Sequence, residues 1–279
     1  MAHAHSSPVP HRTYRRVLTI AGSDSGGGAG IQADLKTFAA LGCYGMSAVT
    51  ALTAQNTVGV SGIHPVPPDF AAAQISAVLE DIGADAVKIG MLYSAELIQV
   101  VAQQLRKFNA RNIVLDPVMV AQSGDRLLRD DAVGAITEHL MPLAEVLTPN
   151  IPEAEVLVGR EIRSVEEIQQ AARDLGRFGS RSILMKGGHR ETADSSDLLY
   201  LCREDRFVTL TAERVGSRNT HGTGCTLSSA IAACLAAGDP LEEAVHRAKE
   251  YISRAIAAGA GYALGRGHGP VHHFFNYWV

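Results

Sequence analysis

One run of residues has the composition of an anion-binding loop. It reads Asn-Thr-His-Gly-Thr-Gly-Cys over residues 219–225 and leads directly into an apolar helical pattern. The N–H groups and the dipole of a helix N-terminus both favour a negative charge there, and glycines let the backbone approach it closely. Cys225 would lie in the first helical turn, where the dipole should lower the pKa of its thiol. We therefore expect a phosphate or a developing oxyanion at this loop. The alternative is a glycine-rich start to a buried helix with an inert cysteine.

A second glycine-rich run occupies residues 22–30, between an expected strand and an expected helix. Residues 28–33 fit the dinucleotide pattern G-x-G-x-x-G/A, but that fingerprint also needs an acid about twenty residues further on. Residues 35–68 contain no Asp or Glu, which disfavours a nicotinamide cofactor, and no Walker A sequence occurs in the chain. Asp34 lies one helical turn beyond Gly30 and could face a ligand hydroxyl. A bare glycine-rich turn without a ligand is the alternative.

Three charged residues stand at expected strand ends or helix starts. Glu153 opens a helix in the run Thr-Pro-Asn-Ile-Pro-Glu, where a carboxylate could hold Mg²⁺ through water, although a Glu in a first turn also simply complements the helix dipole. Asp116 closes a strand at the edge where open α/β sheets bind ligands. Lys186 ends another strand and could reach a phosphate. The alternative for Lys186 is that a lysine at a strand end is usually just solvated.

Short apolar runs alternate with longer helical patterns along the chain. This alternation predicts an α/β fold with a mostly parallel sheet flanked by helices. Near the C-terminal end an antiparallel hairpin and two helices are expected instead. The expected strands are 17–20, 45–52, 85–89, 112–116, 145–148, 182–186, 198–202 and 207–210, and the expected helices are 30–41, 68–81, 95–108, 130–139, 152–159, 165–178, 223–237 and 240–258.

Composition limits the class of protein further. The chain has 279 residues, 46% of them hydrophobic, and a net charge of −4, which excludes bulk disorder and gives no basic footprint for nucleic acid or an anionic membrane. Without a repeat or linker, we expect one domain over residues 16–279 after a flexible tail over residues 1–15. No apolar run is long enough to span a bilayer, and the four cysteines form no CxxC pair, which favours free thiols in the cytoplasm.

Seven blocks of the sequence resemble, in the same order, the motifs of the hydroxymethylpyrimidine/phosphomethylpyrimidine kinases of thiamine biosynthesis. The first of them reads AGSDSGGGAGIQADLK. The blocks are residues 21–36, 50–57, 88–92, 116–119, 185–189, 219–225 and 269–274. The resemblance covers nearly the whole chain and implies a ribokinase-like three-layer sandwich. It also implies that the chain lacks the extra strands, between the first strand and the second helix, that build the large lid of sugar kinases.

The resemblance implies two sets of site residues. The first set binds the aminopyrimidine: Asp34 and Gln55 would hydrogen-bond the ring, and Gly22, Met91 and Val118 would shape its pocket. The second set binds nucleotide phosphate and Mg²⁺ and forms the anion hole: Asp116, Asn150, Glu153, Lys186, Thr220, Gly222, Thr223, Gly224 and Cys225. Asp116 and Glu153 are the expected metal contacts. Cys225 stands where most sugar kinases of this superfamily have an Asp base, and it would accept or orient the substrate hydroxyl proton.

The activity implied is ATP- and Mg²⁺-dependent phosphorylation of the hydroxymethyl group of the aminopyrimidine and then of its monophosphate. Two alternatives remain open. A pyridoxal or pyridoxine kinase acts on a similar hydroxymethyl group, and a binding protein could keep the pocket without turnover. The expected partners are small molecules and a second copy of the chain, in a cytoplasmic homodimer.

Overall fold

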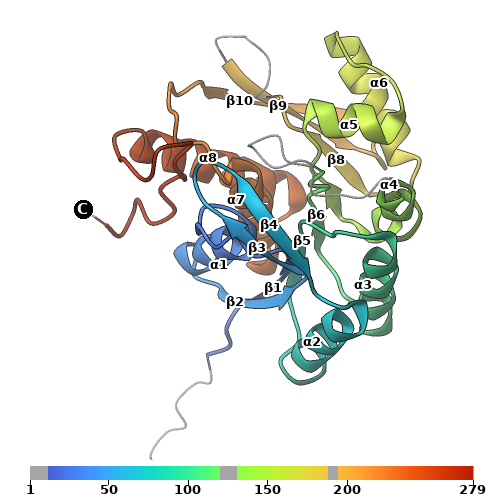
Figure 1. Cartoon of the computed structure of the whole chain (residues 1–279). Coiled ribbons are helices and arrows are strands. Elements are labelled where there is room, and N and C mark those ends of the chain that lie inside the picture. Colours follow the sequence, from blue (N-terminus) through green and yellow to red (C-terminus); the bar gives the residue numbers. More distant parts are fainter. Residues whose placement is uncertain (1–11, 120–130, 188–193, 279) are drawn as a thin grey trace, which may run out of the picture.

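An eight-stranded sheet forms the centre of the computed structural model, which describes residues 12–119, 131–187 and 194–278 (Figure 1). In sheet order its strands are β10 (Arg206–Glu213), β9 (Asp194–Leu201), β8 (Ser182–Met185), β7 (Val146–Leu147), β6 (Ile113–Leu115), β5 (Ala86–Ile89), β1 (Arg16–Ala21) and β2 (Tyr44–Val49). All neighbours from β2 to β8 pair in parallel, whereas β8, β9 and β10 pair antiparallel. The predicted mostly parallel sheet and the hairpin near its end are confirmed.

Helices cover both faces of this sheet and make a three-layer sandwich. Successive side chains of a strand point to opposite faces, so Val17 packs in one core cluster and Leu18 in the other. One face carries α1 (Gly30–Ala40), α7 (Thr223–Ala236) and α8 (Leu241–Gly259). The other carries α2 (Pro68–Asp81), α3 (Ala95–Lys107), α4 (Ala132–Ala135), α5 (Ile151–Val158) and α6 (Val165–Gly176), with a π-helical turn at Ile136–Leu140 and a 3₁₀ turn at Met141–Leu143.

A small hairpin stands apart from the main sheet. The strand expected over 45–52 divides at Thr50, whose hydroxyl donates to the Met91 carbonyl at 2.8 Å. Beyond it, β3 (Ala51–Gln55) pairs antiparallel with β4 (Val60–Pro65) as a separate two-stranded sheet, here called the flap. Two strands outside the main sheet thus do lie between the first strand and the second helix, but they form a two-stranded flap and not a large lid. The flap was missed because most residues of β3 and β4 are partly or fully exposed. Their sequences therefore show little of the apolar pattern that marks a buried strand.

A segment from the C-terminal part of the chain, residues 265–270, ties the flap to the start of α7. It is called the strap. The backbone N–H of His268 donates to the Thr57 carbonyl in the flap turn at 3.0 Å. On its other side, the His221 N–H donates to the Gly269 carbonyl at 3.0 Å. The strap thus joins two loops that are far apart in sequence.

The flexible tail expected over residues 1–15 stays a prediction. Residues 12–15 precede β1 without regular structure, and residues 1–11 lie outside the described part of the chain, as does the first residue of the helix expected over 130–139. Among the described residues, none of the helices is both long and apolar enough to cross a membrane.

Candidate active site

A cavity of about 880 Å³ opens where the parallel strands end. Its walls come from the loops after β1, β5, β6, β7, β8 and β10, from the flap, from the first turn of α7 and from α8. Ligands of open α/β sheets bind at this carboxyl edge. The cavity brings together Gly22, Gln55, Met91, Asp116, Val118, Asn150, Glu153, Lys186, Thr220, Gly222, Thr223, Gly224 and Cys225, that is, all the predicted site residues except Asp34.

The predicted anion-binding loop has the expected geometry. Gly222 is the N-cap of α7, with a φ of +80° that favours glycine, and a Cβ there would collide with the Gly28 carbonyl oxygen. The Thr220 carbonyl accepts the Thr223 hydroxyl at 2.7 Å, which closes the loop. Gly224 lies in the first turn of α7, where N–H groups lack partners within the helix. The loop therefore presents backbone donors and the positive end of a helix dipole to the cavity.

The prediction that the helix dipole lowers the pKa of Cys225 is wrong. Burial raises the pKa of this thiol to about 11. The positive charge of Lys88 opposes this effect, but the carboxylates of Asp34 and Asp116 add to it. At neutral pH Cys225 is therefore a thiol, which can orient a hydroxyl but is not a ready-made base.

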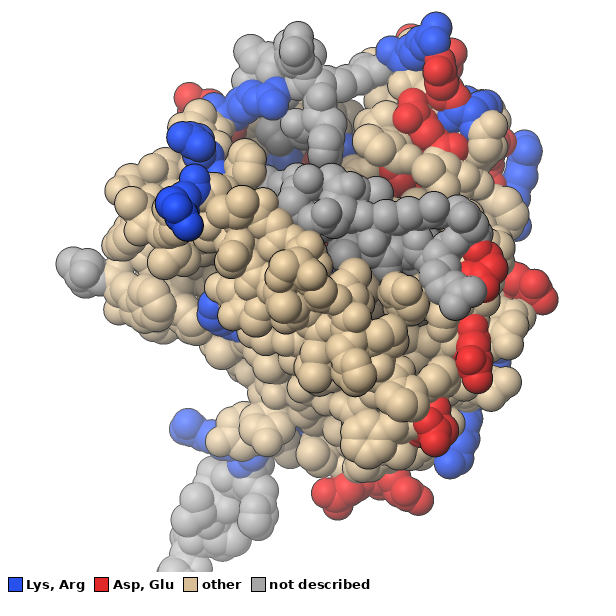
Figure 2. All heavy atoms as spheres, viewed as in Figure 1, with Lys and Arg blue, Asp and Glu red and all other residues tan. Residues whose placement is uncertain are grey.

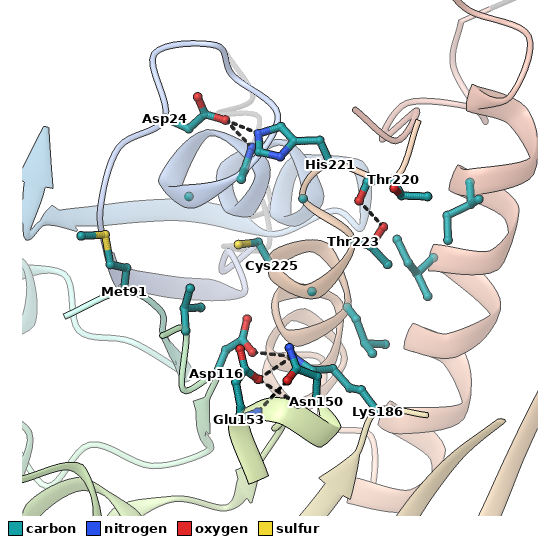
Figure 3. A pocket seen from close by; sticks show the side chains of 18 of the residues that line it. Asp24, Met91, Asp116, Asn150, Glu153, Lys186, Thr220, His221, Thr223 and Cys225 are labelled. Atoms are coloured by element: carbon teal, nitrogen blue, oxygen red, sulfur yellow. Dashed lines mark hydrogen bonds and ion pairs between the residues drawn. The ribbon is translucent and has the colours of Figure 1, made fainter. Parts of the chain in front are cut away.

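Three charged side chains meet beside the anion-binding loop (Figure 3). The Lys186 ammonium donates to Asp116 at 2.8 Å and lies 3.7 Å from the Glu153 carboxylate. Glu153 also accepts the Asn150 N–H, while the Asn150 side chain accepts the Glu153 N–H, so the two form a capping box at the start of α5. The Asn-x-x-Glu element is thus held rigidly by the helix that it opens.

Burial and charge act in opposite directions on this group. Burial alone would raise the pKa of Asp116, but the charges of Lys186 and Lys88 outweigh it and lower the pKa. For Glu153, burial prevails over Lys186 and raises the pKa. Burial would lower the pKa of Lys186, but the Asp116 and Glu153 carboxylates raise it, so its ammonium stays charged.

The other end of the cavity is apolar and lies under the flap. Met91 and Val118 belong to a small hydrophobic cluster with Ala51. Gly22 leaves room for Met91, since a Cβ at Gly22 would lie 3.0 Å from the Met91 sulfur. Gln55 lies at the end of β3 and also lines the cavity, and its side-chain oxygen accepts the Thr53 hydroxyl at 3.1 Å. An apolar floor beside an amide suits a flat heteroaromatic ring with polar edges.

Asp34 does not line the cavity. Its carboxylate is fully buried and accepts the hydroxyls of Thr19 and Ser229, each at 2.6 Å, and the ammonium of Lys88 at 3.0 Å. The prediction that Asp34 hydrogen-bonds the pyrimidine ring is therefore contradicted, because both of its oxygens face the protein interior. In the block over 185–189, Gly188 and His189 lie outside the described residues.

Several residues of the cavity wall were not predicted. Asp24 is buried in the first glycine-rich loop, where it accepts the N–H groups of that loop, and it lies 2.8 Å from His221 Nε2. Lys88 lies inside the apolar strand β5. A charged residue within an apolar strand is unusual, and this signal in the sequence could have identified Lys88 as a site residue. Lys249 pairs with Asp197 at 2.7 Å in the cavity wall, and no pattern in the sequence marked that pair.

The residues in 12–119, 131–187 and 194–278 contain no group of three or more His, Cys, Asp or Glu side chains that could hold a metal ion by themselves. A cation at Asp116 and Glu153 would thus need ligands from a bound nucleotide or water.

A three-layer fold of this topology, with a helix-borne anion loop facing an apolar pocket across one cavity, defines a ribokinase-like kinase of small molecules. The chain belongs to the phosphomethylpyrimidine kinase family, whose sequence model matches residues 24–272. It is 53% identical to the hydroxymethylpyrimidine/phosphomethylpyrimidine kinase of Rhizobium meliloti over 94% of this chain and 97% of that one. It is 57% identical to the thiamine biosynthesis bifunctional protein of Geobacter sulfurreducens over 92% of this chain, but spans only 52% of that protein.

Solved structures agree with this assignment. The phosphomethylpyrimidine kinase of Clostridium difficile superposes with a TM-score of 0.77 at 45% identity, over 86% of this chain and 99% of that one. The ADP complex of Bacillus subtilis pyridoxal kinase superposes with a TM-score of 0.86 at 37% identity, over 94% and 98%. Similar structures thus include complexes with adenine nucleotides, which supports the use of ATP.

Proposed function

We propose that the protein transfers the terminal phosphoryl group of ATP to the hydroxymethyl group of 4-amino-5-hydroxymethyl-2-methylpyrimidine, and then to the monophosphate so formed. The product would be the pyrimidine diphosphate used in thiamine biosynthesis. The observation that carries the proposal is one continuous cavity joining an apolar, amide-edged pocket to a helix-borne anion loop. The names of the relatives that match nearly their whole length support the same substrate.

At the pyrimidine end, Gln55 would hydrogen-bond the polar edge of the ring. Met91 and Val118 would contact its faces, and Gly22 would keep the floor open for them. These contacts would hold the ring so that its hydroxymethyl group points towards Cys225.

At the nucleotide end, Lys186, Asn150 and Thr220 would contact phosphate oxygens. The backbone N–H groups of residues 222–225 would then stabilise the charge of the transferred group. Phosphoryl transfer needs positioning and charge neutralisation more than covalent help. Because the Cys225 thiol keeps its proton at neutral pH, it would orient the attacking hydroxyl. For the second transfer, the attacking phosphate oxygen already carries charge and needs no base.

Asp116 and Glu153 fit a Mg²⁺ ion that arrives with the nucleotide. Mg²⁺ is usually bound by one or two carboxylates, with waters and substrate phosphates completing its shell, and this site offers two carboxylates. When bound, the ion would neutralise phosphate charge. Glu153 would hold its position through the capping box, and Lys186 would turn from the carboxylates towards a phosphate.

Steady-state kinetics with the aminopyrimidine and with pyridoxal test the proposal. ADP release should have a kcat/KM at least tenfold higher for the pyrimidine, and its monophosphate should also be a substrate. A higher value for pyridoxal would favour the pyridoxal kinase alternative. Tight pyrimidine binding without ADP release would favour a binding protein.

We also propose a homodimer with a cytoplasmic location, built from one domain over 16–279 behind the tail. Figure 2 shows a broad face without charged side chains, and Leu52, Val58 and Phe70 are 50–65% exposed on and beside the flap. Exposed apolar side chains that gather on one face often mark an interface. All four cysteines are free thiols, which suits a reducing compartment. Light scattering should give a dimer mass that Leu52→Glu reduces, and a monomeric wild type would refute the assembly.

A further inference from the structure

The protein buries a complete ion pair directly behind the anion-binding loop. Lys88 and Asp34 both have fully inaccessible side chains, and the ammonium lies 3.0 and 3.1 Å from the two carboxylate oxygens. Gly90 leaves space for this ammonium, because a Cβ there would lie 2.8 Å from Lys88 Nζ. A buried ion pair is rarely a net source of stability, since desolvation offsets the attraction. Its presence therefore calls for another role.

The pair is fixed to the helix that carries Cys225. Asp34 accepts the hydroxyl of Ser229, which follows Cys225 by four residues and so lies one turn further along the same side of α7. It also accepts the hydroxyl of Thr19 on β1. With both oxygens held in this way, Asp34 keeps the Lys88 ammonium in one place at the cavity wall.

The charged groups that interact with the Cys225 thiol come from four parts of the fold. Lys88 belongs to β5, Asp34 to α1, Asp116 follows β6 and Lys186 follows β8, while the backbone of Gly30 hydrogen-bonds the thiol. The cations among them are Lys88, which pairs with Asp34, and Lys186, which pairs with Asp116. Burial raises the pKa of the thiol, Lys88 lowers it, and the two carboxylates raise it. The interaction also acts on the lysine. Burial would lower the pKa of Lys88, but Asp34, Cys225 and Asp116 raise it.

We propose that Lys88, held by Asp34, is a positioning residue that keeps a fixed buried charge behind Cys225 and the first turn of α7. Lys88 would favour the thiolate and Asp34 would limit that effect. Cys225 would then share a proton with the substrate hydroxyl but would not stay ionised. This role also explains why Asp34 belongs to the motif although it does not touch the cavity.

The proposal rests on the proposed place of Cys225 at the transfer site, but its test needs neither ATP nor pyrimidine. Alkylation of Cys225 by iodoacetamide would be followed by peptide mass spectrometry from pH 6 to pH 11 in the full-length protein. Only the thiolate reacts, so the rate follows its population. Failure of the kinase assay would leave this measurement unaffected, and the two results remain separable.

The two single variants should change the thiol in opposite directions. In Lys88→Met, alkylation at pH 8 should slow about tenfold, which corresponds to one unit in the titration midpoint. In Asp34→Asn it should accelerate severalfold. In the double variant Lys88→Met/Asp34→Asn, which removes both charges, the rate should fall between wild type and Lys88→Met. Lys107→Met, on the exposed end of α3, is the matched control and should change nothing.

If the Lys88–Asp34 pair only stabilised the fold, the alkylation rates would follow a different pattern. Both single variants would then loosen the site and shift the reactivity of Cys225 in the same direction, together with that of Cys202, the internal reference. That result, or no change in either variant, overturns the proposal. If Lys88→Met does not fold by circular dichroism, Asp34→Asn and the double variant decide the question. Slower alkylation in Asp34→Asn, or a double variant as fast as wild type, would be contrary to the proposal.

Discussion

Gly222 and Gly224 flank the same turn of the anion-binding loop, but the space for a side chain differs greatly between them. An alanine at Gly222 must adopt a φ of +80° and places its Cβ against the Gly28 carbonyl oxygen. The left-handed conformation alone costs about 1–2 kcal/mol for a residue with a Cβ. Removing the collision requires the two glycine-rich loops to separate. The N–H groups would then lose their alignment on the transferred phosphate, an effect worth about 10²–10³ in rate.

An alanine at Gly224 meets no such obstacle. Its Cβ would lie 3.5 Å from Lys186 Nζ and 3.8 Å from an Asp116 oxygen, which are ordinary contacts. Inside a helix, alanine is more favourable than glycine by about 1 kcal/mol. We therefore expect Gly224→Ala to keep its stability and to lose less than about tenfold in kcat. Gly222→Ala should lose both stability and about 10²–10³ in kcat.

Urea unfolding and steady-state ADP release measure the two variants side by side. Unfolding gives the free energy of the strained loop, and kcat gives the loss of transition-state contacts. The reasoning is refuted if Gly222→Ala stays within tenfold of wild type with unchanged stability, or if Gly224→Ala is the more damaging of the two.

Three further predictions concern the rest of the site. Gln55→Ala should weaken pyrimidine binding in calorimetry about tenfold, because a buried polar edge loses its partner, while the affinity for nucleotide stays the same. An unchanged pyrimidine affinity would contradict the assigned pocket. Glu153→Gln keeps an acceptor for the Asn150 N–H, so α5 should persist, and its loss of activity should be partly recovered at high Mg²⁺; an equal loss at saturating Mg²⁺ would leave only a helix-capping role. Burial would raise the pKa of Asp24, but the hydrogen bonds from His221 and the loop amides lower it, so its stabilising effect is present above about pH 4 and is lost as the pH falls further. Urea unfolding from pH 5 to pH 2 should therefore show a shallower loss of stability in Asp24→Asn, and identical slopes would argue against this role.

Most of the fold could be predicted from periodicity. Helices such as α3 and α6 have clear polar and apolar faces, and buried strands such as β1 and β5 are short apolar runs between turn residues. The flap could not be predicted, because its strands are held by each other, by the first glycine-rich loop and by the strap. Nothing in the sequence between Ala51 and Pro65 shows which long-range contacts hold them.

The site shows the same division. Lys186, Asn150 and the residues of the anion loop stand directly at element ends, so their spacing alone places them at one edge of the sheet. Asp34 was correctly predicted to lie on α1, but the direction of its side chain was not predicted. Its buried partner Ser229 lies almost two hundred residues away in sequence. The pKa of Cys225 was misjudged for the same reason. A helix start is visible in a sequence, whereas the desolvation and the carboxylates around a thiol arise only from tertiary packing.

The strap also has a consequence for the order in which the active site is completed during synthesis. A chain leaves the ribosome N-terminus first, at about 5–20 residues per second. The flap, the glycine-rich loops and α7 therefore all emerge before residues 265–270, which tie Thr57 to His221. A nascent chain that has already paired its central strands still lacks this tie. A chain that lacks the strap should therefore bind pyrimidine poorly, and ligand would report only on molecules that contain residues 265–270.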